Sequence, residues 1–341
     1  MKQHNKHLKF ILIPILFITT LILNACASEP QECVCVCQAG ETAAGTDATN
    51  SEEPVENAAA AIPAEGGEFV PCPIAFDSDR DGNLEIYTMD SNGENLVNLT
   101  NDPADDWNPD WSPDGSQIAF VSERNNERSI YIMDADGSNL RQLTNMPESD
   151  LADWSPDGKT IAFTSKANGN FEIYIINADG SNEPINLTNN DAQDLVPVWS
   201  PDGSQIAWLS GDTEGWDLFV MTSDGSNVRQ LTDQGHVYNV KWSIDGNLYL
   251  DWENNVYGSF NCLMDPDGEI LASGFGKGGF VQYFPYWTLE GDKVELVSAD
   301  MDAGNNEIYL IGDIFPDFIL NITNNPGNDE NPDWPALCGL R

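Results

Sequence analysis

The sequence predicts an all-β fold, a six-bladed β-propeller built from four-stranded antiparallel blades. The main observation is a tryptophan-centred motif that recurs every 43 to 47 residues. Its six copies are centred on Trp111, Trp154, Trp199, Trp242, Trp287 and Trp334. A period in this range, with short apolar runs between Asp-Gly turns, is typical of one propeller blade per repeat. After the N-terminus, no helical periodicity of useful length competes with this interpretation.

The second repeat shows how one blade is expected to form. Pro113-Asp114-Gly115 and Asp136-Gly137 supply turns, in which glycine accepts a positive φ. Residues 123–128 form a polar hairpin between two β-branched and aromatic runs. The four expected strands of this blade cover residues 110–112, 118–122, 130–133 and 140–144.

The two ends of the repeat array predict how the ring closes. The first repeat begins at Ile74-Ala75-Phe76, a second-strand segment, whereas the last repeat stops after its first strand, at Trp334. We expect the C-terminal strand to join the N-terminal blade, which leaves no free edge between the ends. When the ends are aligned on the second repeat, Cys72 and Cys338 flank the missing turn. We therefore expect a disulfide between them, and two unpaired cysteines are the alternative.

The order of motifs within the repeat adds a family resemblance. Trp-Ser-Pro-Asp-Gly, Ile-Ala-Phe-x-Ser, Ile-Tyr-x-Met-Asp and Leu-Thr follow one another within residues 111–144. This order resembles the WD40-like repeat of TolB-type propellers, and it extends over roughly residues 70–338. The resemblance implies protein binding in the cell envelope. TolB also carries an N-terminal α/β domain, for which residues 27–68 leave no room, so only the generic expectation of protein binding carries over.

The N-terminus predicts export. Three lysines precede the apolar run 10–23, which is too short for a comfortable membrane span and is typical of a secretory signal. The run ends in Leu23-Asn24-Ala25-Cys26, which resembles a bacterial lipoprotein signal and implies lipidation of Cys26. An ordinary cleavage site or a signal anchor is the alternative.

Three regions follow from this interpretation. They are a lipoprotein signal peptide at 1–25, a flexible acidic tether at 26–68 and the propeller at 69–341. The expected location is the cell envelope, outside the cytoplasm. There the chain would be lipid-anchored to a bacterial membrane, on its periplasmic or cell-surface side. The sequence assigns no role to Cys33, Cys35, Cys37 and Cys262.

Charge limits the class of partner. Once the signal is removed, 11 basic residues face 56 acidic ones, a net charge of −45. Such a surface excludes general attraction to nucleic acid or to anionic lipid headgroups, so the lipid anchor is the only expected membrane contact. We expect a monomer that binds an envelope protein or a basic peptide. The alternative is that the acidity only keeps an exported protein soluble.

Acidic segments enter the first strand of several blades, and in a propeller these segments gather on one face around the central channel. Together with less regular aromatic and histidine positions they predict a partner-binding ring. Its candidate residues are Asp105, Asp106, Asp150, Asp194, His236, Tyr238, Tyr283, Asp329 and Glu330. The alternative is that acids simply occupy solvent-exposed loops.

One segment resembles half of a calcium loop. Asp77, Asp79 and Asp81 occupy positions one, three and five, and Gly82 follows at position six. Position twelve is Thr88, so the bidentate glutamate is missing. Ca²⁺ is therefore a candidate ligand, a polar hairpin is the alternative, and no cofactor is required.

Scarce histidine argues against catalysis. Of three histidines, two lie in the signal, which leaves His236 alone to serve a nucleophilic site, and no Gly-x-Ser-x-Gly motif occurs. We therefore expect a binding protein that is not an enzyme. The alternative is a surface glycan-binding protein, or a glycoside hydrolase or lyase, using channel carboxylates and the aromatic residues of segment 274–287.

Overall fold

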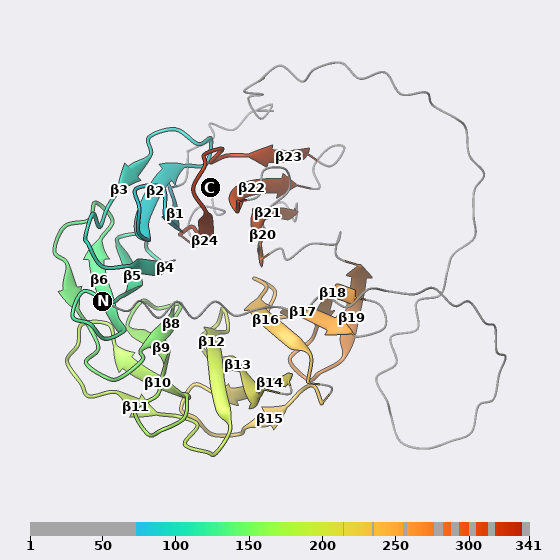
Figure 1. The fold of residues 1–341 in the computed structure, drawn as a ribbon. Helices are drawn as coiled ribbons and strands as arrows, with labels where there is room; N and C mark the ends of the chain where they lie inside the picture. The colour runs from blue at the N-terminus through green and yellow to red at the C-terminus, as the bar shows by residue number, and fades with distance from the viewer. Residues whose placement is uncertain are drawn as a thin grey trace, which may run out of the picture. The chain divides into compact units, whose positions relative to one another are not determined.

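The computed structural model describes residues 73–213, 215–233, 235–254, 258–275, 282–287, 293–299, 305–312 and 318–335. In these residues, 24 strands form six four-stranded antiparallel sheets (Figure 1). The predicted propeller of four-stranded antiparallel blades is thereby confirmed. Within the same residues, no helix is long and apolar enough to cross a membrane.

Blades are numbered here from the N-terminus, and each runs from its first strand to its fourth. Blade 1 contains β24 (Asp329–Asp333), β1 (Pro73–Ser78), β2 (Glu85–Asp90) and β3 (Val97–Asn98). Blade 2 contains β4 (Asp106–Trp111), β5 (Gln117–Ser122), β6 (Ser129–Asp134) and β7 (Arg141–Gln142). Blade 3 contains β8 (Asp150–Trp154), β9 (Thr160–Ser165), β10 (Glu172–Asn177) and β11 (Ile185–Asn186).

The second half of the array follows the same order. Blade 4 contains β12 (Gln193–Trp199), β13 (Gln205–Asp212), β14 (Gly215–Thr222) and β15 (Arg229–Gln230). Blade 5 contains β16 (Val237–Trp242), β17 (Leu248–Asn254), β18 (Gly258–Met264) and β19 (Ile270–Phe275). Blade 6 contains β20 (Gln282–Trp287), β21 (Lys293–Ala299), β22 (Glu307–Gly312) and β23 (Phe318–Asn321).

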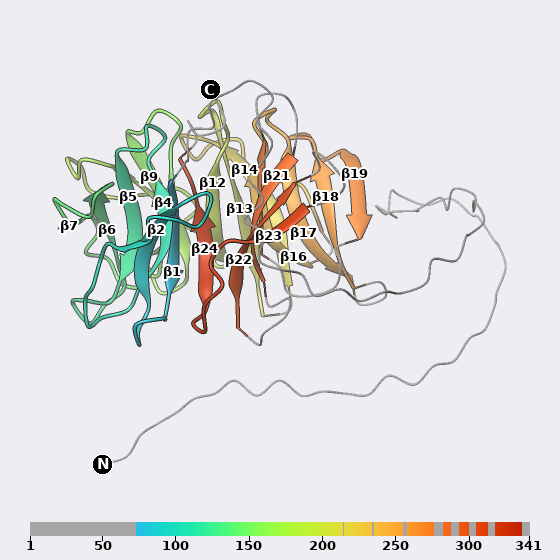
Figure 2. The same ribbon diagram turned by 90° about the horizontal axis from the view of Figure 1, so that it is seen from above.

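The first strand of each blade is the innermost, as Figure 1 shows for β4, β8, β12 and β16. Antiparallel order places the two Asp-Gly turns of a blade at one end and the entry to its first strand at the other. Figure 2 shows the blades from the side, with these two ends on opposite faces. We call the end where the first strands begin the channel face, and the end that carries turns such as Asp114-Gly115 and Asp136-Gly137 the turn face.

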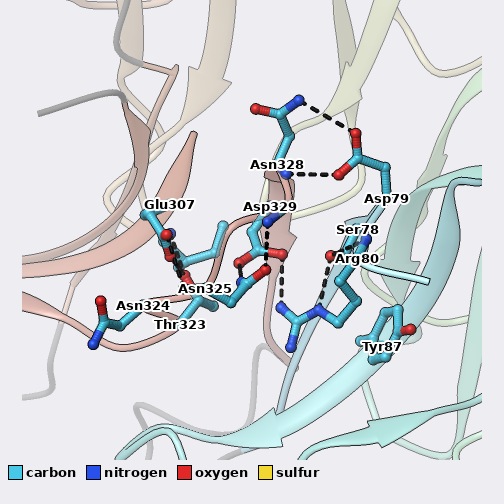
Figure 3. A network of polar contacts seen from close by, with 12 residues as sticks. Ser78, Asp79, Arg80, Tyr87, Glu307, Thr323, Asn324, Asn325, Asn328 and Asp329 are labelled. Carbon is cyan, nitrogen blue, oxygen red and sulfur yellow. Dashed lines mark hydrogen bonds and ion pairs between the residues drawn. The ribbon is translucent and has the colours of Figure 1, made fainter. Parts of the chain in front are cut away.

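The ring closes as predicted, because β24 pairs with β1 within blade 1. Polar side chains reinforce this seam (Figure 3). Arg80 forms an ion pair with Asp329 at 2.6 Å, and the Asn328 backbone N–H donates to Asp79 at 2.7 Å. The predicted disulfide between Cys72 and Cys338 lies outside the described residues, as do Cys26, the signal peptide and the tether.

Apolar residues of the second and third strands form the core between blades. Phe76, Phe120, Phe163 and Trp208 occupy the same position in blades 1 to 4 and are almost fully buried. Each lies against an aromatic residue of the next strand, with ring centroids 5.5 to 6.0 Å apart. Burial of these large rings supplies much of the hydrophobic stabilisation of each blade.

Strand boundaries differ from the prediction at the first and fourth strands. β4 begins at Asp106, four residues before the expected start, because a register shift lets the strand continue past an irregular point. β7 covers only two residues, because the Thr144 hydroxyl, rather than a backbone carbonyl, accepts the Ile130 N–H at 2.9 Å. The Leu-Thr ending of the repeat therefore stops the outer strand with a side chain.

Candidate functional site

The inner strands share an irregular point three residues before the motif tryptophan. The residue there has positive φ in blades 1 to 4, at Asn331 (49°), Asn108 (50°), Leu151 (54°) and Val196 (55°). A register shift accompanies it in each blade. Asparagine tolerates this conformation, whereas it is unusual for leucine and a genuine outlier for β-branched valine. Blades 3 and 4 thus hold a strained backbone on the channel wall where blades 1 and 2 do not.

Three of the predicted binding carboxylates are not on a surface. Asp106, Asp194 and Asp329 are each 0% exposed. Asp106 accepts a hydrogen bond from Arg124 at 2.7 Å. Asp194 accepts one from the Trp208 indole at 3.0 Å, and Asp329 accepts one from Arg80 at 2.6 Å. Burial raises the pKa of Asp106, although Ser122 and Arg124 oppose that effect. The structure therefore corrects the expected ring of accessible acids, because these three anchor the first strand inside its own blade.

Other predicted residues do reach the channel face. Asp105 is exposed, and its carboxylate accepts the Leu84 backbone N–H at 3.1 Å. Tyr238 is 54% exposed on β16. Glu330 is half-buried and accepts a hydrogen bond from the Asn306 amide at 2.7 Å. These side chains remain accessible to a partner.

His236 and Tyr283 are placed less completely. His236 is half-buried and forms an isolated backbone bridge with Trp216. The backbone of Tyr283 lies in β20, and its side chain lies outside the described residues.

Arg128 forms a cluster that the sequence did not indicate. Its guanidinium lies 5.5 Å from the ring centre of Trp107, on β4. Three carboxylates surround it, at 3.4 Å for Glu123, 3.8 Å for Glu148 and 3.5 Å for Asp150. Burial raises the pKa of Asp150, and the Leu151 N–H, Asn108 and Arg128 oppose that effect. Because these residues come from two blades, only the fold brings them together.

The three aspartates of the predicted calcium loop point to separate partners. Asp77 is buried and accepts the Asn331 amide at 2.8 Å, Asp79 accepts from Asn328, and Asp81 accepts the Tyr87 hydroxyl. Over the described residues, no group of three or more histidine, cysteine, aspartate or glutamate side chains is arranged to hold a metal ion. Each of the three carboxylates accepts a hydrogen bond from a different residue.

Comparisons with known proteins agree with the fold. A stretch of 45 residues is 47% identical to the Tol-Pal system protein TolB of Geobacter sulfurreducens, and it spans 13% of this chain and only 10% of that relative. The structure is similar to TolB from Acinetobacter baumannii, with a TM-score of 0.63, 19% identity, and 79% and 67% of the two chains covered.

Further solved structures share the architecture. The putative TolB of Agrobacterium tumefaciens has a TM-score of 0.54 and 23% identity, with 68% of this chain and 91% of that chain covered. An oligogalacturonate lyase in complex with manganese has a TM-score of 0.53 and 15% identity, with 75% and 73% covered. At these identities the likeness shows the fold alone. The sequence profile of the TolB beta propeller domain matches residues 68–152 and 149–274, and the chain belongs to this family.

Proposed function

We propose that this chain is a non-catalytic, protein-binding scaffold of the bacterial cell envelope, and that its partner docks on the channel face. Membership of the TolB beta propeller family supports the general role, since the matched relative is named as part of a Tol-Pal system. The accessible carboxylates Asp105 and Glu330, with the exposed Tyr238, supply a polar and aromatic contact surface. The strongly acidic composition favours a basic protein or peptide.

The strained backbone at Leu151 is the observation that carries this proposal. A bulky residue at positive φ costs on the order of 1–2 kcal/mol, and such outliers cluster at binding and catalytic sites. Asparagine, which occupies the equivalent position in blades 1 and 2, would relieve that cost. Retaining leucine at position 151 is explained if its apolar side chain contacts the partner, whereas Val196 packs against the core of blades 4 and 5.

Capture of the partner provides the test. The tethered propeller serves as bait in a cross-linking pull-down from solubilised envelopes, beside a variant that carries Leu151→Asn. We expect the parent to retain a partner that the variant loses. The change introduces the residue that blades 1 and 2 already use, so it preserves the backbone conformation.

A matched control separates contact from a general loss of apolar surface. Leu140 is 42% exposed next to the outer strand β7, so Leu140→Asn makes the same chemical change on the outer rim. This control should still capture the partner. If the channel-face variant captures the partner as well as the parent does, the channel face is not the docking site.

The anchor and the disulfide stand as separate proposals. We propose that lipid on Cys26 tethers the chain to the membrane, and that Cys72 and Cys338 close the ring covalently; both rest on the sequence. Cys26→Ser should release the protein from washed membranes. Alkylation of both Cys72 and Cys338 without prior reduction would exclude the disulfide.

A further inference from the structure

Three aspartates connect neighbouring blades on the inner wall. Each directly precedes a motif tryptophan and accepts the backbone N–H of the tryptophan in the next blade. The bonds join Trp111 N to Asp333 (2.7 Å), Trp154 N to Asp110 (2.9 Å) and Trp199 N to Asp153 (2.7 Å). Since each bond joins the first strands of consecutive blades, this series connects blades 1 to 4. We call Asp110, Asp153 and Asp333 the clasp aspartates.

The series changes character after blade 3. In blade 4 the equivalent residue is Val198, which has no side-chain acceptor. In blade 5 it is Lys241, whose ammonium group favours the ionised forms of Asp110 and Asp153. In blade 6 it is Tyr286, whose side chain lies outside the described residues. Among the described charged groups at this level of the wall, Lys241 is thus a cation that acts on both Asp110 and Asp153.

The surroundings of Asp110 and Asp153 disfavour their ionised forms. Burial is the largest cause and raises the pKa of Asp153 to about 6, with Asp333 adding to the effect and Lys241 opposing it. Burial also raises the pKa of Asp110 well above its usual range, and the Asp333 and Asp153 carboxylates add to the shift. Like charges and desolvation act in the same direction here.

We propose that the clasp aspartates form a proton-sensitive lock that joins the consecutive blades 1 to 4, and that Lys241 sets the pH at which the lock loosens. In the protonated state, the side chains keep a carbonyl acceptor for each tryptophan N–H without mutual repulsion. Ionisation puts negative charges on these partly buried side chains, and the repulsion between the charges strains the contacts between the inner strands. This lock operates whether or not a protein partner binds the channel face.

The direction of the pH dependence follows from linkage. Between its ordinary pKa of 3.8 and the folded value of about 6, Asp153 holds a proton in the folded chain that it has lost in the unfolded chain. Stability contributed by this group is therefore greatest below pH 3.8 and declines as the pH rises through 6. Removing Lys241 raises the folded pKa further and moves the decline to higher pH.

Amide hydrogen exchange of the full mature chain between pH 5 and 8 tests the lock. After correction for intrinsic exchange, protection of the Trp154 and Trp199 amides should fall as the pH rises. Over this pH range the fall can reach about tenfold, because most of the effect of raising the pKa of Asp153 from 3.8 to about 6 is already lost below pH 5. In Asp153→Asn, which keeps an oxygen acceptor for Trp199, the fall at that amide should be much smaller. In Lys241→Met, the midpoint should move to higher pH.

Two comparisons decide the outcome. Asp114→Asn, a change to an exposed acid on the turn face, should leave the wild-type profile unchanged. A wild-type profile parallel to that of Asp153→Asn, or an unchanged midpoint in Lys241→Met, would overturn the proposal. If Asp153→Asn fails to fold, Lys241→Met still tests it, because that variant keeps all three hydrogen-bonded carboxylates.

Discussion

Aspartates on the two faces of the propeller do opposite things, although the sequence presents both as acids in polar segments. On the turn face, Asp114, Asp157 and Asp202 are exposed or nearly so, and hydrogen bonds from neighbouring Ser or Lys residues lower the pKa of each. On the channel face, burial raises the pKa of Asp106 and Asp150. The comparison teaches that surroundings, rather than local composition, decide whether an acid is a surface charge or an internal anchor.

Local sequence explains the turn face. In the Ser-Pro-Asp-Gly turn, Asp114 accepts from the Ser112 hydroxyl at 2.8 Å and from the Ser116 N–H at 3.0 Å. These donors lie two residues away on either side, so the motif itself contains the site. On the channel face, Asp329 accepts a hydrogen bond from Arg80, which lies 249 residues away in the sequence. Such a partner is set by ring closure and not by neighbours in the chain.

The largest expected effect comes from breaking a channel-face anchor. Asp329→Ala would leave the Arg80 guanidinium buried against Phe76 and Tyr87 without its carboxylate. Removing one partner of a buried ion pair costs about 3–5 kcal/mol. We expect a loss of that size in the free energy of unfolding, measured by urea denaturation.

A second variant shows whether the cost is that of an uncompensated charge. Asp329→Ala combined with Arg80→Met removes both ionic partners and keeps an apolar chain against the rings. The double variant should recover most of the lost stability. If it is as unstable as Asp329→Ala alone, the side chain of Asp329 stabilises the seam through its other contacts, such as the one with Asn325.

A smaller effect is expected on the turn face. Asp114→Asn should cost about 1 kcal/mol, because the amide keeps an oxygen acceptor but loses the negative charge that strengthens its hydrogen bonds. The folded pKa of Asp114 lies below 3.8, so its stabilising effect is present above pH 3.8 and disappears as the pH falls through the folded value. Melting curves of both proteins should therefore differ at pH 6 and converge toward pH 2. A difference that grows in acid would contradict the assignment.

The repeat made the fold predictable. Trp111 and its counterparts mark the first strand, and the Asp-Gly turns mark where strands reverse, because both depend on residues within a few positions. Ring closure was also accessible, since Ile74-Ala75-Phe76 lacks a first strand and Trp334 lacks a second. These inferences used periodicity and turn chemistry, both of which are local.

The candidate site was less accessible to the same reasoning. Asp106 and Asp105 are adjacent in the chain, yet one is fully buried and the other exposed, because β4 begins at Asp106 and Asp105 lies in the loop before it. The cluster around Arg128 joins residues from two blades. The irregular first strand also shifts register at each bulge, which no alternation rule in the sequence reveals.

The smallest expected effect, and the only gain, concerns the backbone strain that distinguishes the channel face. Positive φ on the turn face falls mainly on Gly and Asn, such as Gly115 and Asn95, whereas the channel face also places Leu151 there. Leu151→Asn should raise the free energy of unfolding by about 1 kcal/mol, since asparagine tolerates this conformation. Val196→Asn should gain less, because Val196 also packs against the core of blades 4 and 5. Leu151→Ala is the matched control, as alanine has no preference for positive φ. If alanine stabilises as much as asparagine, the gain comes from removing the leucine side chain rather than from backbone strain, and the two faces do not differ in stored strain.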